Sequence, residues 1–313
     1  MLVSRYKDGP AFLGRHACND AWAMTQNLAD DLVRWYRTAA RDLPWRRPDA
    51  TPWAVLVSEV MLQQTPVTRV LPAYTAWLER WPTPAALAAA TPGDAVRMWG
   101  KLGYPRRALR LHECATELVT RYDGAVPSDI ADLESLPGIG SYTARAVATF
   151  AFGHRHPVVD TNVRRVVART ITGNANPGRP STSRDLATVE RLLPDEPAAA
   201  AEASIALMEL GALVCTAATP RCAACPITSH CTWHASGMPT YDGPIPKPQR
   251  FAGTDRQVRG LLLDVLRNTA HPVTQTQLDA AWTDPEQRIR ALASLVTDGL
   301  VTVTTNGEYS LPT

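Results

Sequence analysis

Four cysteines lie close together in the second half of the chain. They are Cys215, Cys222, Cys225 and Cys231, in the pattern C-x6-C-x2-C-x5-C. Four thiolates are a complete ligand set for a four-iron, four-sulfur cluster, and short, uneven spacers suit one loop wrapped round a cuboidal cluster. The wide outer gaps do not match the paired C-x2-C knuckles of most zinc ribbons, so structural zinc is the lesser alternative. The pattern therefore predicts one 4Fe-4S cluster.

Two carboxylates stand in contrasting surroundings. Glu59 lies within the apolar run VLVSEVML, where desolvation would raise its pKa and keep it protonated. Asp160 follows the apolar run Pro157-Val158-Val159 and precedes the basic pair Arg164-Arg165, a setting that favours an ionised carboxylate. Each residue taken singly is also compatible with a buried carboxylate that is satisfied by hydrogen bonds and has no chemical role.

A glycine-containing turn joins two expected helices in LESLPGIGSYTARAVATFAFG, residues 133 to 153. We expect one helix to stop at Pro137, a turn at Gly138-Ile139-Gly140, and Ser141 to cap a new helix. Glycines let a backbone approach an anion closely, and the amides at a helix N-terminus attract a phosphate. The segment predicts a helix-hairpin-helix that grips a nucleic-acid backbone without reading its sequence. A plain turn between helices is the alternative.

The elements that position these residues are expected to be helical almost throughout. Residues 27 to 41 show mainly helical spacing of apolar side chains, and residues 53 to 64 and 204 to 215 are more uniformly apolar, as in buried helices. A strand pattern occurs only near the end. The fold class is therefore mainly α, and 313 residues with 45% apolar content suffice for two domains.

The composition changes at residues 237 to 253, which we interpret as a Pro/Gly-rich linker. Residues 254 to 313 then show three helical patterns and a hairpin with an Asn306-Gly307 turn, which predicts a separately folded winged-helix-like module. Its expected recognition helix, 285 to 298, carries Arg288 and Arg290. These lie two residues apart and do not share a helix face, so we expect limited phosphate contacts. A structural or protein-binding module is the alternative.

Charge and targeting signals give little direction. Basic residues exceed acidic ones by 32 − 30 = 2, so a nucleic-acid surface would have to be local. The first residues lack the apolar core of a signal peptide, and no stretch reaches the roughly twenty apolar residues of a membrane span. We therefore expect a cytoplasmic protein with reduced thiols, in which Cys18 and Cys114 are ordinary.

Taken together, these motifs give the chain a resemblance to the helix-hairpin-helix DNA glycosylases that carry an iron-sulfur cluster, most closely the adenine DNA glycosylases of the MutY type. The resemblance covers about residues 27 to 235. It rests on LPW at 43 to 45, SEVMLQQT at 58 to 65, KLGYPRRA at 101 to 108, LPGIGSYTA at 136 to 144, VVDTNVRRV at 158 to 166 and the cysteine pattern.

The resemblance implies a two-lobed glycosylase domain over residues 24 to 236, with the cluster loop at 215 to 231. It implies that Glu59 protonates the departing adenine and that Asp160 stabilises or covalently traps the sugar cation. Asn162 would hold the water or that carboxylate, with a simple helix cap as the alternative. Tyr142 stands where endonuclease III enzymes have a lysine that forms a Schiff base, so the product would be an abasic site in an unbroken strand.

The resemblance also implies which segments probe DNA. A base inside a duplex must be flipped out and its place filled, and the residues implied in probing or lining are Arg46, Leu62, Gln63, Gln64, Thr65 and Tyr104, with Gly138, Gly140 and Ser141 on the backbone. Judged alone, a tyrosine such as Tyr104 is more often a core residue than a wedge, and Arg46 is also compatible with a solvated or phosphate-binding arginine. The implied partner is double-stranded DNA with a mispaired adenine, bound by a monomer that is associated with the nucleoid.

The sequence departs from the family at three places. Pro105 replaces a common second tyrosine, residues 1 to 23 lack a counterpart and are expected to be flexible, and the short C-terminal module replaces the Nudix-like domain that helps recognise 8-oxoguanine. We therefore expect excision of adenine opposite 8-oxoguanine or guanine. The alternatives are an endonuclease III-like pyrimidine glycosylase and lyase, an electron carrier, and a non-enzymatic iron-sulfur DNA-binding regulator.

Overall fold

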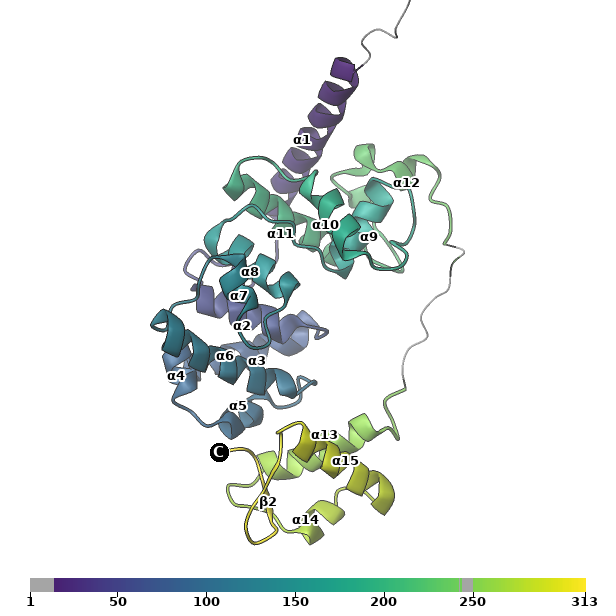
Figure 1. Cartoon of the computed structure of the whole chain (residues 1–313). Coiled ribbons are helices and arrows are strands. Elements are labelled where there is room, and N and C mark those ends of the chain that lie inside the picture. Colours follow the sequence, from purple (N-terminus) through teal and green to yellow (C-terminus); the bar gives the residue numbers. More distant parts are fainter. Residues whose placement is uncertain (1–13, 242, 244–249) are drawn as a thin grey trace, which may run out of the picture. The chain divides into compact units, whose positions relative to one another are not determined.

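The computed structural model describes residues 14–241, 243 and 250–313, and it confirms a mainly helical fold. The chain forms two compact units, which we describe separately (Figure 1). The first unit contains Met1–Arg41 and Gly153–Gly243, and the second contains Asp42–Phe152 and Pro244–Thr313. Within the described residues, no helix has the length and apolarity needed to cross a membrane.

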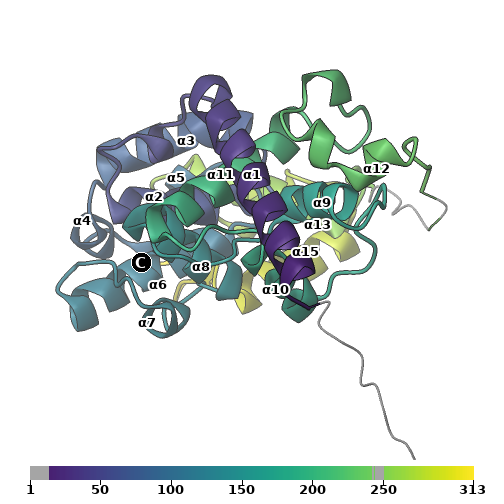
Figure 2. The same ribbon diagram turned by 90° about the horizontal axis from the view of Figure 1, so that it is seen from above.

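The first unit is built round a buried alanine-rich helix. Its elements are α1 (Gly14–Ala39), α9 (Thr161–Thr170), α10 (Thr182–Glu190), α11 (Pro197–Leu213), α12 (Thr232–Ala235) and two short 3-10 turns, η2 (Cys222–Ala224) and η3 (Thr228–His230). Helix α11 starts at a proline and packs against α1 and α9 (Figure 2). Its small side chains allow this close packing. The helix predicted over residues 27 to 41 is part of α1, and the buried one over 204 to 215 is part of α11.

One ion pair is buried at the junction of α1 and α11. Glu209 of α11 is 0% exposed, and both its carboxylate oxygens accept hydrogen bonds from Arg41, at 2.8 and 2.6 Å. The backbone amide of Arg41 also donates to Glu209. A buried carboxylate requires such full compensation, since a single unpaired charge inside a core is strongly destabilising. The pair fixes the point where the chain leaves the first unit.

The helices of the second unit repeat one local signal. Thr-Pro occurs at 51–52, 83–84 and 91–92, and each time the threonine hydroxyl accepts a hydrogen bond from the amide three residues on while the proline occupies the first turn. A β-region cap followed by a fixed φ is pre-organised for a helix start. The unit contains η1 (Pro44–Arg46), α2 (Pro52–Leu62), α3 (Val67–Arg80), α4 (Pro84–Ala88), α5 (Pro92–Trp99), α6 (Arg106–Tyr122), α7 (Ile130–Glu134) and α8 (Ser141–Phe152).

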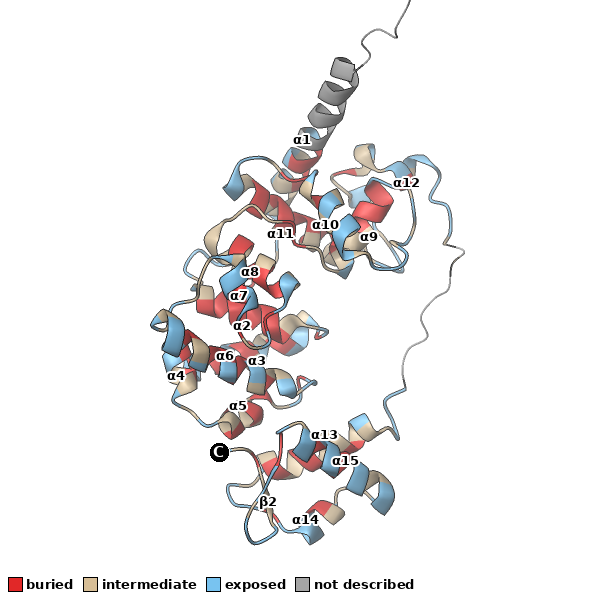
Figure 3. Cartoon of the chain, in the orientation of Figure 1, coloured by how far each residue is buried: buried red, intermediate tan, exposed pale blue. Residues whose placement is uncertain are grey.

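Helix α2 is the centre of this unit. Residues 53 to 61 are all buried, and α2 packs against α3, α6 and α8 (Figure 3). The helix therefore has apolar neighbours on every side, which explains why its sequence is apolar almost without periodicity. This confirms the buried helix predicted over residues 53 to 64, although it ends at Leu62.

The C-terminal module, residues 254 to 313, contains the predicted helices and hairpin. They are α13 (Asp255–Arg267), α14 (Gln275–Asp279), α15 (Pro285–Thr297), β1 (Thr302–Val303) and β2 (Tyr309–Ser310). The strands are antiparallel, with Thr302 opposite Ser310, and Val273 makes a further bridge to Tyr309. The order of helices and hairpin is that of a winged helix. Residues 242 and 244–249 of the predicted linker lie outside the described residues.

The module shares its core with the helices that precede it in the second unit. Val258, Leu262 and other module residues belong to the same buried cluster as the side chains of α2 to α8. Arg97 of α5 donates to the carbonyls of Arg267 and Thr269, and Arg267 donates back to the Val96 carbonyl at 3.1 Å. The module is therefore docked onto α5, which the linker composition did not indicate.

Gly93 is the closest point of this docking. Its amide donates to the Pro312 carbonyl at 2.7 Å, and a Cβ at Gly93 would lie only 2.4 Å from that oxygen. No side chain fits without displacing the last residues of the chain. The glycine is required here by close approach rather than by its backbone angles.

We expect Gly93→Ala to destabilise the folded protein by about 1–3 kcal/mol, because the added methyl must push the Pro312 backbone away. The measurement is urea unfolding of the full-length protein. Gly260→Ala is the matched control, because a Cβ on that α13 glycine meets nothing within 4 Å. It should be neutral or stabilising by up to about 1 kcal/mol. Equal stability of the two variants would contradict the docking contact.

The N-terminal expectations fall partly outside the described residues. Residues 1–13 of the extension predicted over 1 to 23 lie outside them, whereas residues 14 to 23 are the start of α1. The Cys18 side chain is likewise not described. Cys114 is a buried free thiol on α6, and burial raises its pKa to about 12, as expected of an unreactive cysteine.

Candidate functional site

Glu59 and Tyr142 both belong to the second unit. Glu59 is 6% exposed on α2, and Tyr142 lies in the first turn of α8, which packs against α2. Gln63, just after α2, donates to the Thr143 hydroxyl at 3.3 Å and so links the end of α2 to the start of α8. The structure thus assembles the predicted acid, the tyrosine and one predicted probe residue on two packed helices.

Asp160 caps helix α9 in the first unit. Its Oδ1 accepts from the Val163 amide at 2.7 Å, and its Oδ2 accepts from Asn162 Nδ2 at 2.7 Å. The helix-cap alternative for Asn162 is therefore wrong, because Asp160 itself is the cap. Both side-chain ends of Asn162 are engaged, since its Oδ1 accepts from Arg165 at 2.8 Å.

Burial dominates the electrostatics of Asp160. Desolvation raises the pKa of its carboxyl above the usual value, while hydrogen bonds from Val163 and Asn162 and the charge of Arg165 act in the opposite direction. The sequence had suggested that two arginines favour ionisation. Arg164 instead turns away to pair with Asp185 at 2.7 Å, so only Arg165 of the pair acts on this carboxyl.

Arg165 connects this carboxylate to the cysteine loop. Besides Asn162 it binds the backbone carbonyls of Cys215 at 2.8 Å and Gly211 at 2.7 Å. A Cβ on Gly211 would lie 2.7 Å from the Asn162 Cβ, so α11 and α9 approach closely at this point. A continuous series of hydrogen bonds runs from Asp160 through Asn162 and Arg165 to Cys215. Sequence reasoning did not find the role of Arg165.

The four cysteines of the cysteine loop, residues 215 to 231, line one small cavity together with apolar side chains such as Ile227. Arg169 is 3% exposed, points its guanidinium at the Cys215 sulfur at 3.3 Å and stacks on the Trp233 ring at 4.7 Å. The same guanidinium donates to the Thr216 and Ala217 carbonyls. Four thiols round one cavity with a buried cation beside them fit an anionic thiolate-bound cluster.

A single-ion site is a different arrangement. Over the described ranges 14–241, 243 and 250–313, no three Cys, His, Asp or Glu side chains are gathered as the ligands of one metal ion. The four cysteines nevertheless line one cavity and have the donor chemistry of the predicted cluster.

The turn at residues 138 to 140 separates α7 from α8 and is exposed at both glycines. Gly138 has φ +78° and a Cβ there would lie 2.7 Å from the Arg110 Cβ, so two constraints require glycine. Gly140 faces open space within 4 Å. Ser141 begins α8, and its hydroxyl accepts a hydrogen bond from Arg145. The exposed backbone next to a helix N-terminus suits a phosphate contact.

The predicted probe residues divide into exposed and buried ones. Gln64 is exposed with φ +53°, and Tyr104 is 50% exposed with φ +47°, whereas Leu62 and Gln63 are half-buried. Thr65 is 6% exposed, and its hydroxyl accepts from Arg107 at 3.0 Å. Thr65 is therefore an internal residue that positions the turn, and the expectation that it touches DNA is not supported by its location.

Arg107 of α6 joins the two probe segments and was missed from sequence. Its guanidinium donates to the carbonyls of Val60 and Met61 in the last turn of α2 and to that of Gln63 just after the helix. It also donates to the carbonyl of Gly103 in the glycine loop, residues 100 to 105. Burial lowers the pKa of Arg107 to about 10, so it stays charged at neutral pH. The sequence signal for Arg107 is its position in KLGYPRRA, two residues after Pro105 in a segment that carries the resemblance to the family.

Arg46 lies beside a buried aromatic pair. It is half-buried in η1, next to Trp45, whose ring meets Tyr74 edge-on at 5.0 Å. Arg47, by contrast, is exposed and paired with Asp42 at 2.9 Å. The two arginines are thus not one solvated pair.

The arrangement of these elements is shared with known proteins. A protein-family model described as the HhH-GPD superfamily of base excision DNA repair proteins matches residues 57–191. The structure of a thermostable thymine-DNA glycosylase aligns with a TM-score of 0.62 at 24% identity, over 70% of this chain and 99% of that one. Fold and motifs together therefore define a helix-hairpin-helix base excision repair protein.

Two curated relatives narrow the assignment. The adenine DNA glycosylases of Mycobacterium tuberculosis (strain ATCC 25618 / H37Rv) and Mycolicibacterium smegmatis are each 58% identical over 283 residues. The alignments cover 90% of this chain and 92% and 94% of those proteins. The chain belongs to the adenine DNA glycosylase family. Since only a tenth of it is unmatched, the alignments include much of the C-terminal module, which these relatives share.

The two glycines of the turn provide a prediction about DNA binding. Gly140→Ala should leave stability unchanged but weaken duplex binding several-fold, because its methyl occupies space that a phosphate would approach. Gly138→Ala should cost about 1–3 kcal/mol of stability, because the new Cβ is strained and collides with Arg110. Thermal unfolding and fluorescence anisotropy with a duplex measure the two effects. Undiminished affinity in Gly140→Ala would remove the turn from the DNA interface.

Proposed function

We propose that this protein hydrolyses the N-glycosidic bond of adenine mispaired with 8-oxoguanine or guanine in double-stranded DNA, and leaves an abasic site. The observation that carries the proposal is the 58% identity to adenine DNA glycosylases along nearly their whole length. The packing of the Glu59 and Tyr142 helices within the second unit and, separately, the hydrogen bonds that hold Asp160 in the first unit support it. We also propose that the protein acts as a monomer on chromosomal DNA in the cytoplasm.

Departure of adenine requires an acid. An anionic purine is a poor leaving group, and protonation in the transition state makes it neutral. Glu59 is proposed for this role because it is almost fully buried within α2, the helix against which the Tyr142 helix packs. Because Glu59 lies on a packed helix, the position of its carboxyl group is also fixed.

The sugar left behind is an oxocarbenium-like cation that needs a carboxylate opposite it. Asp160 is proposed to stabilise or trap this cation. Asn162 is proposed as a positioning residue that holds this carboxylate, because it donates to Asp160 while it accepts from Arg165. A fixed carboxylate stabilises the developing charge without reorganising during the reaction.

Tyr142 determines the fate of the DNA strand after the base has left. Its phenol cannot form an imine, so the abasic sugar is released by water and the strand stays intact. Gln64 and Tyr104, which are exposed and held in left-handed backbone conformations, are proposed to enter the base stack as adenine is flipped out. Arg46 is proposed to line the adenine pocket, and Gly138, Gly140 and Ser141 to contact the phosphate backbone.

The cofactor is proposed to be one 4Fe-4S cluster bound by Cys215, Cys222, Cys225 and Cys231. When bound, the cluster supplies a structural cross-link of the cysteine loop. Arg169 and Arg165 bind the carbonyls and one sulfur of this loop, so they hold it against α9, the helix that Asp160 caps.

Asp160→Asn and Glu59→Gln should each lower single-turnover adenine release by about 10²–10⁴-fold, because each removes a charge or proton used in the transition state. Duplex affinity should stay near normal. The substrate is an A:8-oxoguanine duplex, treated with alkali before electrophoresis. Asp185→Asn is the matched control, since it changes an acidic side chain that pairs with Arg164 but does not touch Asp160.

The same assay separates the alternatives. Product strands should be cut only after alkali or heat. Strand cleavage without alkali, together with borohydride trapping of the protein on DNA, would favour a glycosylase with lyase activity. Normal excision by Asp160→Asn would remove that residue from the mechanism, and no excision by the unsubstituted protein would favour a non-enzymatic role.

Protein purified anaerobically should contain iron and sulfide in equal amounts and absorb as a yellow-brown solution, because four thiolates are available in one cavity. Cys222→Ser should lower both contents and reduce duplex affinity. Cys114→Ala, which removes an ordinary buried thiol, is the control that should retain the colour. Stoichiometric zinc without iron would contradict the cluster.

A further inference from the structure

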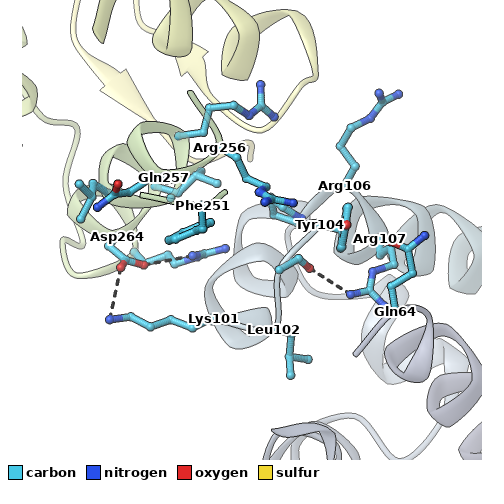
Figure 4. A pocket seen from close by; sticks show the side chains of 18 of the residues that line it. Gln64, Lys101, Leu102, Tyr104, Arg106, Arg107, Phe251, Arg256, Gln257 and Asp264 are labelled. Atoms are coloured by element: carbon cyan, nitrogen blue, oxygen red, sulfur yellow. Dashed lines mark hydrogen bonds and ion pairs between the residues drawn. The ribbon is translucent and has the colours of Figure 1, made fainter. Parts of the chain in front are cut away.

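A large cavity lies within the second unit, between the glycine loop and α13 of the C-terminal module (Figure 4). Its volume is about 1090 Å³, at the upper end of the 300–1,000 Å³ or so that is usual for small-molecule pockets. One wall contains Gln64 and Tyr104, and the other contains Phe251 and Arg256. The cavity therefore adjoins the probe segments and has room for more than one nucleotide.

The charge of the lining favours an anion. Seven basic and two acidic side chains line the cavity, an excess of five positive charges in a chain whose formal net charge is +2. The acidic residues are already paired, Asp264 with Arg267 and Asp298 with Arg259. Lys101 pairs with Asp264 at 3.4 Å, but its side chain is 84% exposed. A phosphate can therefore compete with Asp264 for its ammonium group. The net charge of the whole chain gave no indication of this local basic surface.

Two exposed aromatic rings line the same cavity from opposite walls. Phe251 is 55% exposed and Tyr104 is 50% exposed. Arg256 lies over the Phe251 ring at 5.5 Å, and Arg107 lies over the Tyr104 ring at 5.6 Å. Exposed aromatic rings beside cations in a groove are what proteins use to bind unpaired nucleotides, because each base stacks on a ring while the cations take the phosphates.

The two arginines of the predicted recognition helix are both paired with carboxylates. Arg288 pairs with Asp279 at 2.7 Å, and Arg290 is bound by both oxygens of Asp255, at 2.8 and 3.0 Å. In contrast, Arg256 makes no ion pair in the part of the chain that the structure describes. The module therefore presents its free positive charge on α13 rather than on α15.

We propose that this cavity is a second nucleotide-binding site that takes an unpaired nucleotide of a DNA duplex. The base stacks on Phe251 and Tyr104, and Arg256 and Lys101 hold the flanking phosphates. This inference rests on the proposed function for the source of the nucleotide, because flipping adenine out leaves its partner base without a pair. Phe251 and Arg256 would then contribute to recognition of the opposing base.

The test compares the affinity of the full-length protein for two duplexes that contain no mispaired adenine: one fully paired, the other with a single unpaired guanosine. Anisotropy should show a preference for the unpaired nucleotide. Phe251→Ala should reduce that preference about tenfold, the scale of one base–aromatic stack, whereas Phe251→Tyr should keep it. Arg256→Gln should reduce it too. Arg290→Gln, on α15, is the matched control and should not.

An unchanged preference in both Phe251→Ala and Arg256→Gln would overturn the proposal. Equal weakening on both duplexes would also overturn it, since it would indicate a general backbone contact. Because these duplexes undergo no excision, the result is independent of catalysis. Loss of adenine release in the separate excision assay would reject the proposed function while leaving this binding result in place.

Discussion

The carbonyl groups at the end of α2 impose the constraint on which the second unit depends. The last carbonyls of any helix lack partners within it, and α2 is buried along nearly its whole length, so water cannot serve them. The guanidinium of Arg107 donates hydrogen bonds to these carbonyls and also to the glycine loop. This one half-buried guanidinium therefore holds both the turn after Leu62 and the glycine loop that carries Tyr104.

The first unit uses the same device with different residues. Arg165 and Arg169 satisfy carbonyls of the cysteine loop, and Arg165 at the same time orients Asn162 toward Asp160. Planar guanidiniums with several donors are suited to binding irregular backbone segments, which a lysine with one compact charge would do less well. In both units, then, the irregular segments that carry the proposed chemistry are held by arginines on regular helices.

Much of this arrangement could be predicted from sequence because its signals are local. Apolar spacing and turn residues predict the mainly α fold, the buried helix round Glu59, the glycine turn, and the module's helices and hairpin. Arg107, Arg165 and Arg169 could not be found in this way, because an arginine in a sequence resembles a surface residue. Several of their backbone partners are also distant in sequence, such as Val60 for Arg107, 47 positions away, and Cys215 for Arg165, 50 positions away. The burial of Thr65 and the docking at Gly93 were missed for the same reason.

The shared core of the second unit has a consequence for synthesis on the ribosome. Helix α5 emerges long before the module that docks onto it, since about 160 residues separate Val96 from Val258. Translation proceeds at about 5–20 residues per second, so α5 lacks its contacts with the module for on the order of ten seconds or more. In nascent chains the residues of α5 that contact the module therefore lack these contacts during about half of translation, a period in which chaperones have access to them.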